Sequence, residues 1–262
     1  MTVPDVTAQG VLRLRGRSFG PGQLVIMARA GRTPDARAPA RDTSAAMDRV
    51  HAVVAEGADL VDLGGGPAAP GTDLGGGPAG PGTQVTAAEE SRWAVPLVAS
   101  VRAAYPDLVI GVGAWRHETA RELCAAGADL LRDHGERLSE VAAEYGAGLV
   151  CGNAERAVAR GVDRSRVVIE ADMGSWPWPW ASPEATRRLE DVVAAGWPVL
   201  VSVPGPTRAN GPAGCLAAAA VWAWLGARVF RADQVTQTRR VLDMVSAIRG
   251  DRGPACALRG LA

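Results

Sequence analysis

The sequence predicts a single (β/α)8 barrel of the TIM type, and three observations support this α/β fold. The chain has 262 residues, which is an ordinary length for one such barrel. From about residue 24 onward, eight short apolar runs alternate with eight helical patterns. The apolar runs are continuous rather than alternating, as expected for parallel strands covered on both faces. A doubly wound sheet is the alternative, but its usual five or six strands would leave several of these elements unused.

The first four predicted β/α units occupy residues 24–145. Leu24–Arg29 is a continuous apolar run, and the helical pattern Thr43–Glu56 follows it, with Thr43 or Ser44 as its cap and Gly57 as its stop. The next predicted strands are Ala58–Gly64, Leu108–Ala114 and Ala128–Arg132. The next predicted helices are Thr86–Tyr105, Arg116–Ala126 and Glu136–Tyr145, of which the last two end at Gly127 and Gly146.

The other four units occupy residues 148–249. Their predicted strands are Gly148–Gly152, Arg166–Ala171, Pro198–Val203 and Ala227–Arg231. Their predicted helices are Ala154–Arg160, Pro183–Ala195, Ala213–Leu225 and Gln234–Arg249. Gly161, Gly196 and Gly226 are the corresponding helix stops. Residues 1–23 are expected to be an N-terminal lead-in, and residues 24–262 one barrel domain.

The charged composition excludes several kinds of chemistry and several kinds of partner. All 28 basic residues are arginine, which excludes a Schiff-base lysine, a Walker-type lysine and a pyridoxal-phosphate anchor. Codon usage in a GC-rich genome accounts for most of this bias. The 28 acidic residues bring the net charge to zero, and no basic stripe stands out, so no nucleic-acid partner is expected.

No membrane association or export is expected either. No apolar run approaches the roughly 20 residues of a membrane span, and the first twenty residues contain no signal core. The four cysteines are scattered without a CxxC pair, so they are interpreted as reduced, mostly buried thiols of a cytoplasmic protein. No metal site and no cofactor are predicted.

A tandem repeat interrupts the second unit. Residues 62–72 (DLGGGPAAPGT) and 73–83 (DLGGGPAGPGT) differ at one position. Two copies cannot form a solenoid, and such Gly/Pro-rich chain is costly to order. The predicted loop, residues 64–83, is interpreted as a neutral mobile loop from a recent duplication, or as a lid over the barrel mouth.

Several short motifs follow the predicted strands in a characteristic order. They are Arg32-Thr33-Pro34-Asp35, Asp62-Leu63-Gly64-Gly65, Ala128-Asp129-Leu130-Leu131 leading to Asp133, Gly196-Trp197-Pro198-Val199-Leu200, and Phe230-Arg231. In this order the chain resembles the dihydropteroate synthase family, and more closely its actinobacterial paralogue without an assigned role. The resemblance covers most of residues 24–262. It implies a barrel that binds a pterin diphosphate, expels pyrophosphate with the help of magnesium, and joins the pterin to p-aminobenzoate.

Most of the polar contacts that this resemblance implies are altered. Gly31 stands where the family has an asparagine of the anion and metal site, and Gly113 where it has an aspartate. Further replacements are Arg132 for asparagine beside a retained Asp133, Glu170 for aspartate with Asp172 close by, Pro204-Gly205-Pro206 for Ser-Arg-Lys, and Asp233 for histidine beside a retained Arg231. Each missing partner costs a buried pterin about 1–3 kcal/mol, so the chain is predicted not to make dihydropteroate.

The altered strand ends provide candidate ligand contacts. Trp115, Trp176, Trp178 and Trp180 fall on strand-end loops, either as a clamp for a flat or cationic ligand or as cover for apolar surface. Further candidate contacts are Arg132, Arg208, Arg231, Asp233 and His134, with Arg231 as the best holder of an anion or carbonyl. Cys215, near the start of a helix, is interpreted as a packing residue or as a thiol of lowered pKa.

Five carboxylates are also expected at the barrel mouth: Asp62, Asp133, Glu170, Asp172 and Asp233. The first four are candidate acid–base groups, with Glu170 or Asp172 as the preferred proton shuttle, because neighbouring carboxylates raise one another's pKa. Pairing with Arg29, Arg132, Arg208 or Arg231 as plain salt bridges is the structural alternative.

Two functions follow from these observations. The first is a repurposed enzyme of secondary metabolism that acts on an aromatic or cyclic small molecule by condensation, cyclisation or dehydration. The second is a catalytically silent binding or scaffold homologue of the synthase. In either case the resemblance implies a homodimer formed through the last two helices, where Trp222 and Trp224 serve either that surface or the core.

Overall fold

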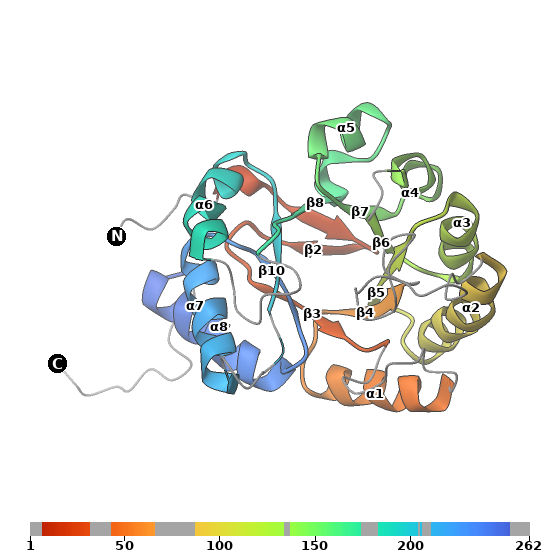
Figure 1. Ribbon diagram of the computed structural model, residues 1–262, viewed down its shortest axis with the longest axis horizontal. Helices are drawn as coiled ribbons and strands as arrows, with labels where there is room; N and C mark the ends of the chain where they lie inside the picture. Colours follow the sequence, from red (N-terminus) through yellow and green to blue (C-terminus); the bar gives the residue numbers. More distant parts are fainter. Residues whose placement is uncertain are drawn as a thin grey trace, which may run out of the picture.

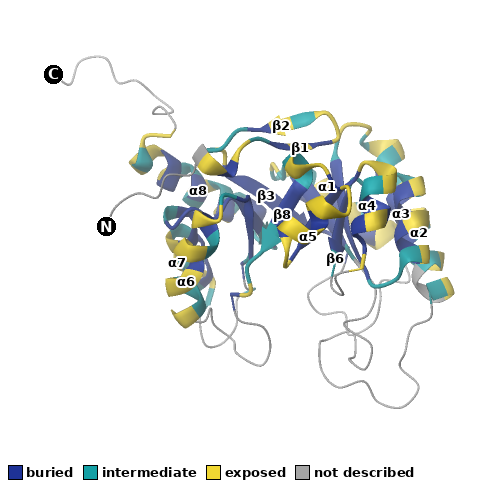
Figure 2. Cartoon of the chain, turned by 90° about the horizontal axis from the view of Figure 1, so that it is seen from above, coloured by how far each residue is buried: buried dark blue, intermediate teal, exposed yellow. Residues whose placement is uncertain are grey.

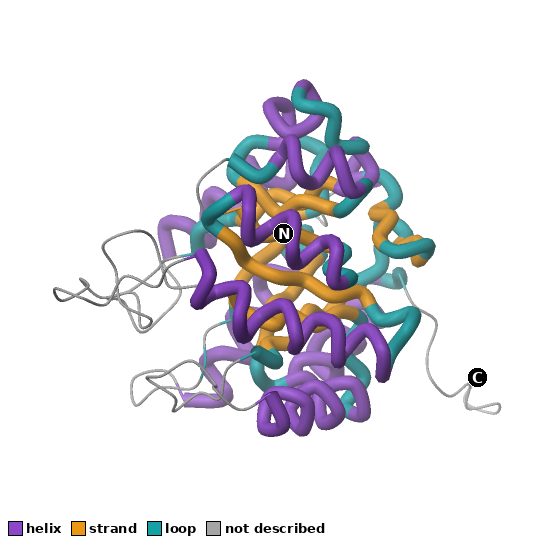
Figure 3. Tube along the Cα trace, turned by 90° about the vertical axis from the view of Figure 1, so that its right-hand side faces the viewer, coloured by secondary structure: helices purple, strands orange, loops and turns teal. Residues whose placement is uncertain are grey.

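The computed structural model describes residues 7–31, 43–65, 87–133, 137–173, 183–203, 205 and 211–251. Eight parallel strands form a closed barrel in the order β10-β3-β4-β5-β6-β7-β8-β9, and the helices lie around its outside (Figures 1 and 3). The barrel strands are β3 (Val25–Arg29), β4 (Leu60–Gly65), β5 (Val109–Ala114), β6 (Leu130–Asp133), β7 (Gly148–Cys151), β8 (Val167–Glu170), β9 (Val199–Ser202) and β10 (Val229–Ala232). The predicted (β/α)8 barrel is therefore confirmed.

The helices alternate with the strands as predicted. They are α1 (Thr43–Ala55), α2 (Ala87–Ala104), α3 (His117–Ala126), α4 (Ser139–Tyr145), α5 (Ala154–Ala159), α6 (Pro183–Ala194), α7 (Gly211–Trp224) and α8 (Val235–Arg249). Short 3-10 turns occur at Thr7–Gln9 and Arg164–Arg166. None of the described helices is long and apolar enough to cross a membrane.

The predicted glycine stops have the backbone conformation that their role requires. Gly127, Gly146, Gly161, Gly196 and Gly226 have φ angles of 114°, 60°, 96°, 77° and 98°. These angles lie in the left-handed region, which a residue with a Cβ adopts only with strain. At Gly127 the backbone N–H donates to the carbonyl of Cys124, which closes the last turn of α3.

An antiparallel hairpin that the sequence did not predict covers one end of the barrel. It consists of β1 (Leu12–Leu14) and β2 (Arg17–Phe19), which Figure 2 shows lying across that end. Leu12, Leu14 and Phe19 are buried together with the lower interior residues of the barrel strands. The hairpin within the lead-in expected at residues 1–23 therefore closes one end of the barrel and adds side chains to its core.

A buried arginine holds this hairpin in place. Arg228, just before β10, is 1% exposed, and its guanidinium donates to the carbonyls of Gly10, Phe19 and Gly20. No carboxylate pairs with it in the described part of the chain, and burial lowers its pKa to about 10. Within the described residues, the cation is therefore held by backbone carbonyl dipoles.

Arg228→Met is expected to lower the free energy of unfolding by about 2 kcal/mol, because three carbonyls lose their donors while the desolvation cost of the lone cation is relieved. Urea denaturation of the two proteins measures this difference. The matched control is Arg13→Met on the exposed face of the same hairpin, for which a change within about 0.5 kcal/mol is expected. Equal losses in both variants would contradict the role of Arg228.

Candidate functional site

Four charged residues form the upper interior layer of the barrel. On alternate strands, the lower interior positions are the apolar Leu60, Leu130, Val168 and Val229. Two residues further along the same strands lie Asp62, Arg132, Glu170 and Arg231, on β4, β6, β8 and β10. Because side chains of alternate strands share a layer in such barrels, these four residues lie at one level. We call them the charged tetrad; their charges alternate around the barrel.

Three contacts link the members of the charged tetrad. Arg231 Nε donates to Asp62 Oδ2, and Arg132 Nη1 lies 3.4 Å from the same oxygen. On its other side, Arg132 Nη2 donates to Glu170 Oε1 at 2.9 Å. The backbone N–H of Gly64 donates to Asp62 Oδ1 at 3.0 Å, so both oxygens of Asp62 are occupied. The tetrad is a neutral, internally paired network rather than a set of unpaired acids.

Burial and pairing together set the protonation of the tetrad. Burial by itself raises the pKa of Asp62, but Arg231 and Arg132 outweigh this effect and lower that pKa to about 2. Burial likewise disfavours the charged form of Arg132, but Asp62 and Glu170 leave its pKa raised. At Arg231 burial prevails over Asp62 and lowers the pKa to about 10. All three groups are therefore charged at neutral pH, and Asp62 is unsuited to acid–base exchange.

A second ion pair lies beside the tetrad. Arg29 Nη1, at the end of β3, donates to Asp233 Oδ2 at 2.9 Å and to the carbonyl of Val203 at 3.0 Å. Arg49 of α1 donates to the backbone carbonyl of Asp233 at 2.7 Å. Of the predicted arginine–carboxylate pairings, the structure thus brings together those of Arg29, Arg132 and Arg231.

The other described candidates have different surroundings. Asp133 accepts the backbone N–H groups of Arg137 and Leu138, at 3.0 and 2.8 Å, and so holds the chain that leads into α4. Asp172 is exposed, and the ring of Trp115 is half-buried. His134, Trp176, Trp178, Trp180, Arg208 and residues 66–83 of the Gly/Pro repeat lie outside the described residues. Gly64 and Gly65, expected as the start of this loop, belong to strand β4.

The lowered pKa expected for Cys215 is wrong, whereas its role as a buried packing residue agrees with the structure. Burial raises the pKa of Cys215, and its Sγ donates to the carbonyl of Gly211 at 3.2 Å inside α7. Burial also raises the pKa of Cys124 to about 12. Cys124, Cys151 and Cys215 are buried, as predicted for packing thiols. The start of a helix lowers the pKa of a thiol, but at Cys215 this effect is smaller than the rise in pKa that burial in an apolar environment causes.

The end of β3 leaves no room for the asparagine of the family's metal site. A Cβ added to Gly31 would lie 1.5 Å from the carbonyl oxygen of Leu63. The strands approach so closely because the N–H groups of Ala30 and Gly31 both point to the carbonyl of Asp62, at 2.9 and 3.3 Å. Gly31 therefore offers no side-chain oxygen to the magnesium that the family resemblance implies, and its surroundings leave no space for a residue that would.

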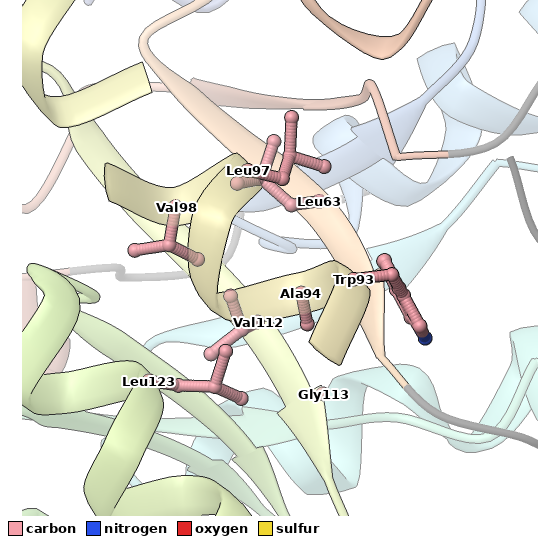
Figure 4. Close-up of a pocket in the computed structure, with 9 residues that line it drawn as sticks. Leu63, Trp93, Ala94, Leu97, Val98, Val112, Gly113 and Leu123 are labelled. Carbon is pink, nitrogen blue, oxygen red and sulfur yellow. The ribbon is translucent and has the colours of Figure 1, made fainter. Parts of the chain in front are cut away.

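Two of the cavities that described residues line are small. One lies beneath α2, between the ends of β4 and β5, and is lined by Leu63, Trp93, Leu97, Val98, Val112 and Leu123 (Figure 4). A second lies among Val203, Cys215, Asp233 and Thr238. Each has a volume of about 10 Å³, which is room for about one water molecule and not for a small-molecule ligand. The first is also apolar, so it offers no group for acid–base chemistry.

Sequence reasoning named all four members of the charged tetrad but not their arrangement. The alternation of side chains along a strand could have predicted the arrangement. Each member of the charged tetrad lies two residues beyond a buried apolar residue of its strand and therefore points to the same side of the sheet. Sequence reasoning missed Thr238, whose buried hydroxyl has no hydrogen-bond partner among the described residues. No sequence signal marks it.

Comparison with known proteins agrees with this architecture. Residues 27–156 match the family described as pterin binding enzyme. The chain is 36% identical to the "Inactive dihydropteroate synthase 2" of Mycobacterium tuberculosis, over 95% of this chain and 90% of that protein. A solved structure from Mycobacterium tuberculosis shares 36% identity over 92% of this chain and 99% of its own, with a TM-score of 0.71.

A more distant relative shows how far the fold extends. The dihydropteroate synthase of Yersinia pestis in a sulfonamide complex has a TM-score of 0.76 at only 19% identity, over 92% of this chain and all of its own. At that identity the likeness concerns the fold alone. The mycobacterial relatives, in contrast, share both the fold and more than a third of the aligned sequence. The chain therefore belongs to the dihydropteroate synthase family.

Proposed function

We propose that this chain is a catalytically silent member of the dihydropteroate synthase family, which keeps the barrel as a binding or scaffold module. The charged tetrad is the observation that carries this proposal. Glu170, at the position of the family's pterin-anchoring carboxylate, already accepts a hydrogen bond from Arg132. A pterin would have to displace this arginine, and breaking a buried ion pair costs about 3–5 kcal/mol.

Two further features support catalytic silence. Asp233 stands where the family has a histidine that grips the diphosphate, and its carboxylate pairs with Arg29 and offers no donor to an anion. Gly31 has no space for the family's asparagine side chain. The relatives named inactive share 36% identity with the chain, which agrees with this proposal. In the described residues, no feature favours the alternative of a repurposed enzyme.

The purified chain is expected to form no dihydropteroate from p-aminobenzoate and the hydroxymethyl-dihydropterin diphosphate with Mg²⁺. It is also expected not to support growth of a strain that lacks its own synthase. The synthase of Streptococcus pyogenes, 26% identical to this chain, serves as the positive control in both assays. Growth rescue, or turnover above the background without protein, would overturn the proposal.

The scaffold role includes a homodimer formed through α7 and α8. Val221 on α7 and Met244 and Ile248 on α8 are exposed, at 45%, 62% and 65%. The two helices pack against each other, so these side chains lie on neighbouring elements. Large apolar side chains gathered on adjacent helices are typical of a protein contact. Trp222 does not belong to this surface, because it is 1% exposed and its Nε1 donates to Thr186.

Light scattering of the purified chain is expected to give twice the monomer mass, and Met244→Arg is expected to give the monomer. A matched control is Arg13→Glu on the N-terminal hairpin, away from α7 and α8, which is expected to leave the dimer intact. A monomeric wild-type chain at micromolar concentration would refute the dimer without affecting the proposed catalytic silence.

A further inference from the structure

The charged tetrad contains a ligand site that the chain itself fills. We propose that Asp62 and Glu170 form a binding site for a planar guanidinium-type cation, whose resident ligand is the side chain of Arg132. The site is thereby closed to other ligands for as long as Arg132 occupies it. This proposal rests on the same Arg132–Glu170 contact as the proposed function but concerns binding, so the synthase and growth assays test the proposed function independently of it.

The contacts of Arg132 are those of a bound cation. Its two terminal nitrogens reach carboxylates of two different strands, Nη1 toward Asp62 of β4 and Nη2 toward Glu170 of β8. The residue is only 7% exposed, although the Glu170 side chain is 29% exposed. The guanidinium thus lies inside the barrel mouth, in contact with a carboxylate that is partly exposed.

The remaining polar atom of Arg132 takes no part in the contact. Nε is buried and has no hydrogen-bond partner in the part of the chain that the structure describes. An unpaired buried donor is costly, so the arginine is an imperfect occupant whose affinity depends on its two terminal nitrogens. The recognised unit is therefore the amidinium end, two N–H₂ groups on one planar carbon, and a free guanidinium can supply the same unit.

Charge balance defines the class of ligand. Asp62 keeps Arg231 as a partner when Arg132 is absent, whereas Glu170 has no other cation among its described contacts. Truncation of Arg132 leaves the four-residue layer with one excess negative charge and a gap of the shape of a guanidinium. A planar cation with fixed donors fits such a gap better than an ammonium or sodium ion, which present a point charge.

Chemical rescue tests this proposal. Arg132→Ala is expected to unfold at a lower temperature than the wild type, and millimolar guanidinium chloride is expected to raise its Tm by about 3–5 °C at ten times the Kd. Sodium chloride and urea at the same concentration control for ionic strength and for planar shape without charge. Neither is expected to raise the Tm, and guanidinium is not expected to raise that of the wild type.

The double variant Arg132→Ala/Glu170→Gln assigns the effect to the site, because it is expected to lose the guanidinium response. Three results would overturn the proposal: no response in Arg132→Ala, the same response in wild type, or an unchanged response after Glu170→Gln. If Arg132→Ala does not fold, Arg132→Met keeps the volume and permits a double-mutant cycle. Glu170→Gln is then expected to cost less stability in Arg132→Met than in wild type, and equal costs would overturn the proposal.

Discussion

Asp62→Asn is expected to lower the free energy of unfolding by about 3–5 kcal/mol, the largest loss for any single member of the charged tetrad. Asp62 is 1% exposed, and both Arg231 and Arg132 lie against one of its oxygens. The amide keeps the shape of the carboxylate but removes the charge, so two buried guanidinium groups lose their shared partner. Their mutual repulsion then adds to the loss of the hydrogen bonds.

Urea denaturation at neutral pH measures this difference. The matched control is Glu144→Gln, because Glu144 pairs with Arg121 on the surface with side chains that are 49% and 45% exposed. Such an exposed pair contributes about 0–1 kcal/mol. If Asp62→Asn cost no more than Glu144→Gln, the tetrad would not be a stabilising network.

The same variant has a predicted pH dependence. Since folding lowers the pKa of Asp62 from 3.8 to about 2, its contribution is fully present above pH 4 and is lost as the pH falls through about 2. This contribution amounts to about 2 kcal/mol. The stability of the wild type is therefore expected to fall more steeply between pH 4 and 2 than that of Asp62→Asn. Parallel curves for the two proteins would contradict this assignment.

Gly31→Asn is expected to be the second most damaging substitution, at about 3 kcal/mol or more. The variant restores the residue that the family resemblance implies at this position. Its Cβ would meet the carbonyl oxygen of Leu63 at 1.5 Å, so the backbone of β3 or β4 must move. That movement disturbs the N–H groups that Ala30 and Gly31 direct at the carbonyl of Asp62.

Thermal and urea denaturation of Gly31→Asn, Gly31→Ala and wild type test this prediction. Gly31→Ala is expected to be damaging too, because the clash begins at Cβ. The matched control is Gly20→Ala, since a Cβ at Gly20 meets nothing within 4 Å. The amide oxygen of Gly31→Asn is not expected to confer Mg²⁺ binding in calorimetry. A stable, Mg²⁺-binding Gly31→Asn would show that the ancestral metal site can be rebuilt by one residue.

The sequence predicted the barrel strands closely because each is a short apolar run bounded by polar or glycine residues. The predicted Leu108–Ala114 and Gly148–Gly152, for example, appear as Val109–Ala114 and Gly148–Cys151. It did not predict the hairpin of β1 and β2, whose strands have three residues each. Such short segments carry little periodicity, and their burial comes from the barrel end that they cover rather than from a local pattern.

The sequence also identified the chemistry of the strand ends before the structure placed them. It named Asp62, Arg132, Glu170 and Arg231 as candidates, together with the alternative that arginines and acids pair. It could not choose between an acid–base site and a salt-bridge network, because that choice depends on distances between strands that are far apart in the chain. The structure decided the choice through the 2.9 Å contact of Arg132 with Glu170 and the shared carboxylate of Asp62.

By itself, then, the sequence determined the fold class, the family resemblance and the residue types at the barrel mouth. These properties follow from hydrophobic periodicity and local motifs, which are written along the chain. Only the tertiary structure decided that alternate strands bring opposite charges to one level, and that Gly31 has no space for a side chain. Both depend on barrel closure, which sets the strand stagger and the close approach of neighbouring backbones.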